Sequence, residues 1–243
     1  VLMKALLDTK LADLQSQLDG QLYFDSIVKA LYATDASVYR ELPTAVAFPK
    51  NKKDIQSLIK FVSENGLSII PRAAGTSLAG QCVGDGIVVD TKYFNQILEI
   101  NQQEKWVRVQ PGVVRDELNT FLKPYGLFFS PITSTANRAT MGGMVGNNSS
   151  GTTSIVYGST RDHVLEIKTL LSNGSEVTFK KTNKASFFKS SRKAITESFF
   201  ILLKLYPFKF SSNLFSTSLK FTFKDSEFML LWSHRSIVVT FEF

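Results

Sequence analysis

Two loops built from small residues are the parts of this sequence whose residue types and spacing could do chemistry. The first reads PRAAGTSLAGQ, residues 71–81, and holds two glycines, three alanines and two hydroxyl residues directly after the apolar run LSIIP. Because no bulky side chain stands in the way, a large ligand can approach the backbone N–H groups of such a loop. Backbone N–H groups favour anions, so we expect an anionic ligand here.

The spacing of the two glycines argues against the two common nucleotide-binding motifs. Gly75 and Gly80 are separated by four residues, which does not match GxGxxG, and Gln81 takes the place of the lysine in GxxxxGK[ST]. A nicotinamide-binding Rossmann site and a P-loop are therefore disfavoured. Taken alone, the loop is equally compatible with a structural turn.

A second loop of the same kind favours the binding interpretation. Residues 130–164 read SPITSTANRATMGGMVGNNSSGTTSIVYGSTRDHV, in which glycines alternate with hydroxyl and amide side chains. Such a stretch offers backbone and side-chain donors without fixed positive charge. This donor set suits a pyrophosphate together with a polar heterocycle.

Composition and charge limit what these loops can belong to. The chain has 243 residues, of which 44% are hydrophobic and 20% charged, so it is long enough for a sizeable core in one or two domains. The net charge of +7 is uneven: residues 1–182 carry 19 Lys and Arg against 17 Asp and Glu, and residues 183–243 carry 9 against 4. Because the excess lies mainly in the C-terminal segment, we do not expect nucleic acid as a partner.

Cysteine usage and hydropathy bear on metal sites and location. Cys82 is the only cysteine, which excludes an internal disulfide, a CxxC zinc site and a four-cysteine iron–sulfur cluster within this sequence, and no metal is expected. The N-terminus does not read as a secretion signal, and the apolar run FFILL is far shorter than the roughly 20 residues that span a bilayer. We therefore expect no transmembrane segment and a cytoplasmic location, with peripheral membrane association as the alternative.

Alternating helix and strand patterns must position the two loops. Leucines at helical spacing predict an N-terminal amphipathic helix that packs as a lid on the main body: Leu7, Leu11, Leu14 and Leu18. Asp54 is expected to cap or open a helix that ends at Gly66, and Asn173-Gly174 predicts a β-hairpin. Strands are expected at residues 44–49, 67–71 and 86–91 and in a pair within 97–112, followed by a short helix within 114–126.

The last quarter of the chain differs from the rest. All 14 glycines lie at or before Gly174, and residues 183–243 hold 12 of the 20 phenylalanines. This segment shows no sustained helix or strand period, which favours a tail translated from the wrong frame of an A/T-rich gene, or a truncated product. A Phe-rich β region is the alternative.

Three stretches carry a resemblance to a known family. PRAAGTSLAGQCVGDGIVVD, VQPGVVRDELNTFL and ATMGGMVGNNSSGTTSIVYGSTRDHVLEIKTLLSNGSE resemble, in order and spacing, the FAD-binding domain of FAD-linked oxidases of the vanillyl-alcohol oxidase type. Within that superfamily, residues 38–180 are similar to the D-lactate dehydrogenase and glycolate oxidase flavoprotein group. LYATDASVYRELPTAVAFP resembles the long members of the group, which carry a cysteine-rich iron–sulfur domain far downstream.

The resemblance implies a fold and a division of the chain. The fold would be α+β, a PCMH-type FAD-binding domain of two α/β subdomains that clasp the cofactor, with mixed sheets and an N-terminal helix. The parts would be an N-terminal helical extension over residues 1–37, the FAD-binding domain over 38–182 and an atypical tail over 183–243.

The resemblance also implies FAD as the cofactor and assigns its contacts. The first loop would wrap the pyrophosphate with backbone amides, the second would lie along the isoalloxazine and ribityl groups, and the strand that begins near Val164 would pass the adenine end. The implied residues are Arg72, Ala73, Ala74, Gly75, Thr76, Ser77, Gly80, Gln81, Pro111, Gly112, Pro131, Ser134, Thr140, Gly142, Gly143, Asn147, Ser150, Gly151, Tyr157, Gly158 and Val164.

Three residues that invite a chemical role also have simpler interpretations. His163 is expected to be an ordinary strand-entry residue rather than a catalytic base or a flavin attachment site. Cys82 is expected to be a small packed side chain rather than a covalent anchor. For Arg72, a phosphate and a nearby carboxylate stand as equal alternatives as partner.

The reaction that the resemblance implies is oxidation of a D-2-hydroxy acid of the D-lactate or glycolate type. The substrate α-C–H would pass a hydride to the flavin while a base accepts the hydroxyl proton, and relatives then pass electrons to an acceptor protein or a quinone. In the family, the residues that bind the carboxylate and take the proton follow the FAD domain, so no catalytic residue is assigned and little or no turnover is expected. The alternative is a non-catalytic FAD-binding module or an inactive truncated fragment.

Overall fold

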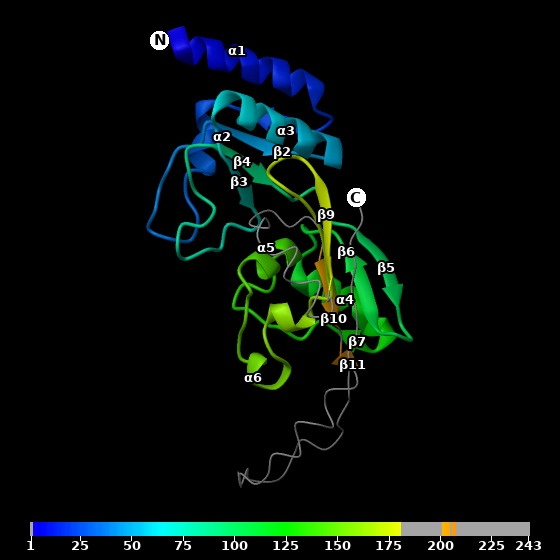
Figure 1. Cartoon of the computed structure of the whole chain (residues 1–243). Coiled ribbons are helices and arrows are strands. Elements are labelled where there is room, and N and C mark those ends of the chain that lie inside the picture. The colour runs from blue at the N-terminus through cyan, green and yellow to red at the C-terminus, as the bar shows by residue number, and fades with distance from the viewer. Residues whose placement is uncertain (1, 181–200, 205, 208–243) are drawn as a thin grey trace, which may run out of the picture.

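The computed structural model describes residues 2–180, 201–204 and 206–207, which form two lobes (Figure 1). The first lobe holds α1 (Leu2–Gln17), β1 (Gln21–Tyr23), α2 (Ser26–Leu31), β2 (Ala45–Phe48), α3 (Lys52–Asn65), β3 (Ile69–Arg72) and β4 (Ile87–Asp90). The second holds β5 (Ile97–Asn101), β6 (Trp106–Val109), α4 (Arg115–Leu122), η1 (Lys123–Tyr125), β7 (Leu127–Phe128), α5 (Met141–Gly146), α6 (Ser154–Tyr157), η2 (Thr160–His163), β8 (Glu166–Leu170), β9 (Glu176–Lys180), β10 (Ile201–Lys204) and β11 (Tyr206–Pro207). None of the helices in this described part has the length and hydropathy needed to cross a bilayer.

The first lobe is a four-stranded mixed sheet with helices on both faces. Its strand order is β1-β2-β4-β3, in which β1 runs antiparallel to β2 and the other neighbours are parallel. Every residue of β2 and β4 is buried, because alternate side chains face α3 on one side and α2 on the other. The strands predicted at residues 44–49, 67–71 and 86–91 are confirmed, and their unbroken apolar runs reflect a sheet covered on both faces.

The N-terminal helix predicted from leucine spacing is α1. Its Leu11 and Leu14 are buried in one cluster with Leu58, Phe61 and Val62 of α3. α1 therefore packs on the main body, as predicted, and covers the outer side of α3, away from the glycine loops (Figure 1). β1 follows α1 and pairs with β2, so the segment before residue 38 contributes an edge strand to the sheet. The division of the chain at residues 37 and 182 stays a prediction.

The start of α3 differs from the prediction. Asn51 is the N-cap, and its side chain accepts a hydrogen bond from Asp54 N at 3.0 Å. Asp54 is 2% exposed, and its carboxylate accepts hydrogen bonds from the backbone N–H groups of Asp19, Gly20 and Lys50. Asp54 therefore connects the turn after α1 to the turn before α3. In the sequence, its position near the start of a helical pattern is also typical of a helix cap.

Two antiparallel units and short helices build the second lobe. β5 and β6 form a hairpin that β10 extends in the order β10-β6-β5, and β8 pairs with β9 around the predicted turn. Gly174 in that turn has a φ of +77°, a conformation that glycine adopts at little cost. The core beneath these strands contains Leu118 and Leu122 of α4 and Met141 and Met144 of α5.

Helix α3 joins the two lobes. Its Ile55 and Ile59 belong to the core of the second lobe, whereas Leu58 belongs to the core of the first. The Gln56 side chain also donates to Gly174 O in the β8–β9 turn at 3.3 Å. The two lobes therefore share one helix, which determines how they face each other.

Two short strands of the C-terminal segment are described. β10 pairs antiparallel with β6, and β11 pairs antiparallel with β7. The rest of residues 183–243, on which the wrong-frame hypothesis and its Phe-rich β alternative depend, lies outside the described residues.

Candidate functional site

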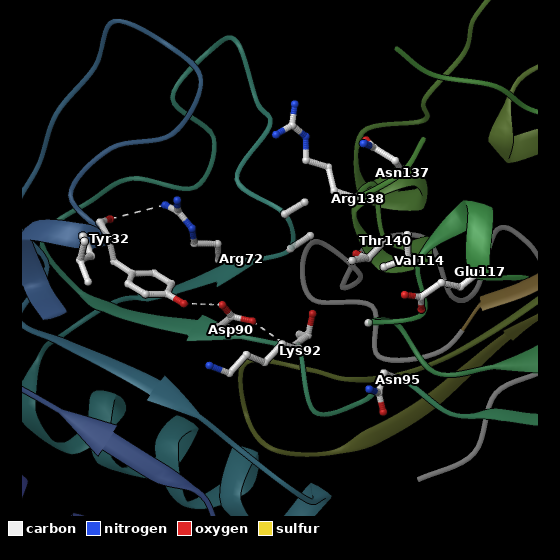
Figure 2. Close-up of a pocket in the computed structure, with 15 residues that line it drawn as sticks. Tyr32, Arg72, Asp90, Lys92, Asn95, Val114, Glu117, Asn137, Arg138 and Thr140 are labelled. Carbon is white, nitrogen blue, oxygen red and sulfur yellow. Dashed lines mark hydrogen bonds between the residues drawn. The ribbon is translucent and has the colours of Figure 1, made fainter. Parts of the chain in front are cut away.

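A cleft of about 1650 Å³ lies between the lobes and is lined by both predicted loops. A smaller cavity of about 600 Å³ adjoins it and shares Arg72, Ala73, Ala74 and Thr140 with it (Figure 2). The predicted residues that line one cavity or both are Arg72, Ala73, Ala74, Gly75, Thr76, Ser77, Gln81, Pro111, Gly112, Ser134, Thr140, Gly142, Gly143, Asn147 and Ser150. The structure thus brings together two loops that are about sixty residues apart in the sequence.

Two glycines of α5 lie in close contact with other segments, one with the first loop and one with its own lobe. A Cβ added to Gly143 would lie 2.8 Å from the Cβ of Ala73, and one added to Gly142 would lie 2.7 Å from the Cβ of Pro111. Both distances are shorter than real Cβ contacts, so a side chain at either position would displace the neighbouring segment. Gly143 is therefore required for the close approach of the two lobes, and Gly142 for the packing of α5 against Pro111 within the second lobe.

The first loop carries a row of backbone N–H groups without a backbone acceptor among the described residues. Within the described residues, the backbone N–H groups of residues 73–76 donate no hydrogen bond to another backbone group, whereas that of Ser77 donates to the Cys82 sulfur. The Ser77 hydroxyl holds the loop from inside, because it accepts from Ala79 N and donates to Gln81 Oε1 at 2.9 Å. Four consecutive amides that line the cleft, those of residues 73–76, suit an anionic group such as a diphosphate.

The Arg72 guanidinium binds backbone carbonyl groups. The two predicted partners were a phosphate and a carboxylate, so neither prediction described this arrangement. It donates to Thr34 O at 2.8 Å and to Cys82 O at 3.3 Å, and it lies 4.9 Å from the ring centroid of Tyr32. Gly75 lies directly beside it, since an added Cβ would be 2.5 Å from Arg72 Nη2, and its φ of +65° also favours glycine. Arg72 therefore clamps the first loop to the segment that contains Tyr32 and Thr34.

Residues 31–36 form a wall of the cleft that sequence analysis missed. The Tyr32 hydroxyl donates to Asp90 at 2.7 Å (Figure 2), and Ala36 N donates to Gly75 O at 3.1 Å. Burial, followed by the bond to Asp90, raises the pKa of Tyr32 well above its usual value, so Tyr32 stays a neutral donor. The segment opens the stretch LYATDASVYRELPTAVAFP, whose family resemblance did not indicate a role in the cleft, because that role depends on bonds to residues far along the chain.

Cys82 lies behind the first loop as a packed thiol. It is 8% exposed, and its Sγ lies 3.4 Å from Asp35 Oδ2. Burial, opposed by Arg72 and reinforced by Asp35, raises the pKa of the Cys82 thiol to about 11. For Asp35, burial alone would raise the pKa, but hydrogen bonds from Ser37 and Cys82 hold it below its usual value. Both pKa values are shifted away from pH 7, so neither Cys82 nor Asp35 is prepared to act as a nucleophile or a base at neutral pH.

The second loop is shaped by side chains that bind its own backbone. Thr140 is the N-cap of α5, and its hydroxyl accepts from Gly143 N at 3.4 Å. Asn148 has a φ of +47°, a left-handed conformation that asparagine tolerates, and its side chain accepts from Arg161 N at 2.9 Å. These bonds determine the path of the loop along the cleft.

Six predicted residues lie outside both cavity linings: Gly80, Pro131, Gly151, Tyr157, Gly158 and Val164. The three glycines among them face close neighbours, since an added Cβ would meet Tyr39 at residue 80, Ile132 O at residue 151 and Asp162 at residue 158. Their assignment as cofactor contacts stays a prediction.

His163 is a core residue just before β8. It is 0% exposed, its ring packs edge-on against Phe129 with centroids 5.7 Å apart, and its Nε2 lies 3.3 Å from Ser130 Oγ. It is also outside both cavity linings, which agrees with the expectation that it is not a catalytic base.

Arg138 lines both cavities, although sequence analysis did not select it. The sequence could have indicated this residue, because Arg138 is the only charged residue between Ser130 and Gly158. The expectation of a loop without fixed positive charge was therefore wrong. Further lining residues come from the β8–β9 hairpin, for which the strand pattern offers no sign: Thr169, Leu171 and Phe179.

Comparisons with known proteins agree with this geometry. A family model described as an FAD binding domain matches residues 43–180. D-2-hydroxyglutarate dehydrogenase of Pseudomonas putida is 46% identical over 162 residues, which are 65% of this chain and 16% of that protein. Glycolate oxidase subunit GlcD of Bacillus subtilis is 36% identical over 163 residues, which are 65% of this chain and 35% of that subunit. The solved structure of 6-hydroxy-D-nicotine oxidase from Arthrobacter nicotinovorans has a TM-score of 0.67 at 21% identity, over 78% of this chain and 43% of that one.

The chain spans well under half the length of these curated relatives. The matched segment contains both loops and α5, and the fold is the α+β, PCMH-type arrangement of two lobes. The residues present suit the cofactor, because Gly143 lets the loops lie close while amides without a backbone acceptor line the cleft between them. The chain therefore belongs to the family of FAD-binding domains, and its cofactor is FAD.

Proposed function

We propose that this chain is the cofactor-binding part of a flavoprotein oxidoreductase that oxidises a D-2-hydroxy acid to a 2-oxo acid. The observation that carries the proposal is the single cleft in which both small-residue loops meet. The relatives that match both loops are named for D-2-hydroxyglutarate and glycolate, which are both 2-hydroxy acids. A protein or quinone acceptor would take the electrons onward.

The chain's own residues would bind and orient the cofactor. The amides of residues 73–76 would hold the pyrophosphate, and Thr140, Asn147 and Ser150 would offer hydroxyl and amide groups along the flavin end. FAD, when bound, accepts a hydride from the α-carbon of the substrate.

A non-catalytic FAD-binding module is the second candidate. Oxidation of an alcohol needs a group that accepts the hydroxyl proton. The cavity-lining groups whose pKa is shifted, Tyr32, Asp35 and Cys82, all move away from neutrality. This observation favours a module to which a partner chain or domain brings the proton acceptor.

The absorption spectrum of the purified chain, after incubation with FAD and removal of unbound cofactor, tests the cofactor site. Stoichiometric retention of the flavin bands supports the proposal, whereas loss of flavin from a folded chain contradicts it. Anaerobic addition of D-2-hydroxyglutarate, D-lactate or glycolate then separates the two candidates. Bleaching of the flavin band by one of these acids supports the enzyme, and a band that dithionite bleaches but none of the acids does supports the module.

A further inference from the structure

Arg138 is a cation that lines the cleft and has no ion-pair partner among the described residues. Within the described residues, its guanidinium donates no hydrogen bond and forms no ion pair, although it lines both cavities. Figure 2 shows the side chain extending from the second loop into the space between the lobes, toward the first loop. The other cations in the linings are engaged, because Arg72 binds backbone carbonyl groups and Lys92 lies 3.7 Å from the ring centroid of Phe48.

The backbone that carries Arg138 is anchored on α4 of the second lobe. Arg138 N donates to Thr135 O at 2.9 Å, and Arg115 N donates to Ala139 O at 2.9 Å. The Arg115 side chain is 8% exposed and donates to Pro131 O at 3.1 Å, which secures the chain before this turn. Arg138 therefore reaches into the cleft from the second lobe, opposite the amides of residues 73–76 in the first.

We propose that Arg138 binds the pyrophosphate of FAD across the cleft, an inference that rests on FAD binding there. A diphosphate is negatively charged on both phosphates. Arg72 adds positive charge beside the first loop, but its guanidinium donates to backbone carbonyl groups, whereas the donors of Arg138 are not engaged within the described residues. A guanidinium supplies the charge together with two parallel N–H donors, the geometry that suits phosphate oxygens. The carboxylate of a hydroxy acid has the same chemistry, so the test must separate these two anions.

The test measures the FAD affinity of the full chain at low and high salt, for the wild type, Arg138→Gln and Arg138→Lys. We expect Arg138→Gln to weaken FAD binding about ten- to a hundredfold, because it removes a charge-assisted contact. It should also reduce the loss of affinity that salt causes, whereas Arg138→Lys should recover part of both. Arg161→Gln is the matched control, since Arg161 is exposed and outside both cavities, and it should leave both measurements unchanged.

The possible outcomes are distinct. Equal losses of affinity in Arg138→Gln and Arg138→Lys, with wild-type salt dependence, would indicate a role in loop shape and overturn the proposal. Unchanged FAD affinity in Arg138→Gln would also overturn it, and a higher concentration of hydroxy acid needed to bleach the flavin would then assign Arg138 to the substrate carboxylate. Failure of the wild type to bind FAD would contradict the proposed function itself.

Discussion

Gly75 lies against the guanidinium of Arg72, and the shape of the first loop depends on this contact. An alanine at residue 75 would place its Cβ 2.5 Å from Arg72 Nη2 while keeping a φ of +65°. The guanidinium would have to move, and its hydrogen bonds to Thr34 and Cys82 would be lost. The absence of a Cβ at residue 75 therefore leaves room for the guanidinium that holds one wall of the cleft in place.

We expect Gly75→Ala to weaken FAD binding about tenfold or more and to lower the free energy of unfolding by about 2 kcal/mol. Gly66→Ala is the matched control, because Gly66 has a φ of +64° and nothing lies within 4 Å of an added Cβ. It should lose only the roughly 1 kcal/mol of a left-handed backbone and keep wild-type affinity. FAD titration and denaturant unfolding measure both, and equal affinities in the two variants would contradict the clamp.

The reactivity of Cys82, the only cysteine of the sequence, tests the structure of the same region. Because the pKa of Cys82 rises from 9.0 to about 11, its thiolate at pH 8 should be about a hundredfold rarer in the folded chain than in the unfolded one. We expect labelling by a disulfide reagent to be slower in the native state by at least this factor. A raised pKa also means that the stability from the neutral thiol is present below pH 9 and is lost toward pH 11. Rapid labelling of native protein at pH 8 would contradict this prediction.

At the scale of elements, α5 is one of the places where the lobes touch. Gly143 and Gly146 lie in this one helix, yet an added Cβ would meet Ala73 at the first and nothing within 4 Å at the second. In the cofactor-free chain, Gly146→Ala should raise the free energy of unfolding by about 0.5–1 kcal/mol through helix propensity. Gly143→Ala should lower it instead, because Ala73 or α5 must shift. Thermal unfolding measures both, and equal stabilisation would show that the contact is not tight.

At the scale of the whole molecule, α3 and the β8–β9 hairpin hold the lobes at a set separation. Glu176 at the start of β9 binds Lys52 of α3 and also Lys168 of β8, the latter at 2.7 Å. Hydrogen bonds from Lys168 and then Lys52 hold the pKa of Glu176 below its usual value. One carboxylate thus connects the two sides of the cleft.

We expect Glu176→Gln to lower the free energy of unfolding by about 0.5–1 kcal/mol at neutral pH. Because the folded pKa is lowered, this contribution is present above the ordinary value of 4.5 and is lost as the pH falls through the folded pKa. Unfolding curves of wild type and variant should therefore converge in acid, and a constant difference would contradict the ion pair. Glu64→Gln is the control, since Glu64 pairs with Lys60 at 3.9 Å on an exposed face and should show no measurable change.

Local features of the sequence were sufficient for the elements and for the character of the site. Gly174 marks the hairpin because its turn needs a positive φ, and the apolar runs of β2 and β4 mark a sheet covered on both faces. The two small-residue loops likewise predicted a cleft that exposes backbone, and both loops line the same cleft. Each of these inferences depends on interactions within a few residues.

Tertiary structure alone decided which groups share the cleft. Asp54 looked like a helix cap and instead binds the turn after α1, and Arg72 binds carbonyl groups of distant segments. Arg138 extends from the other lobe into the cleft that the first loop lines. Residues 31–36 became a wall of the site in the same way. The roles of Asp54, Arg72, Arg138 and residues 31–36 all depend on contacts between residues far apart in the chain. A single sequence shows periodicity and composition, but it does not show which distant residues come into contact.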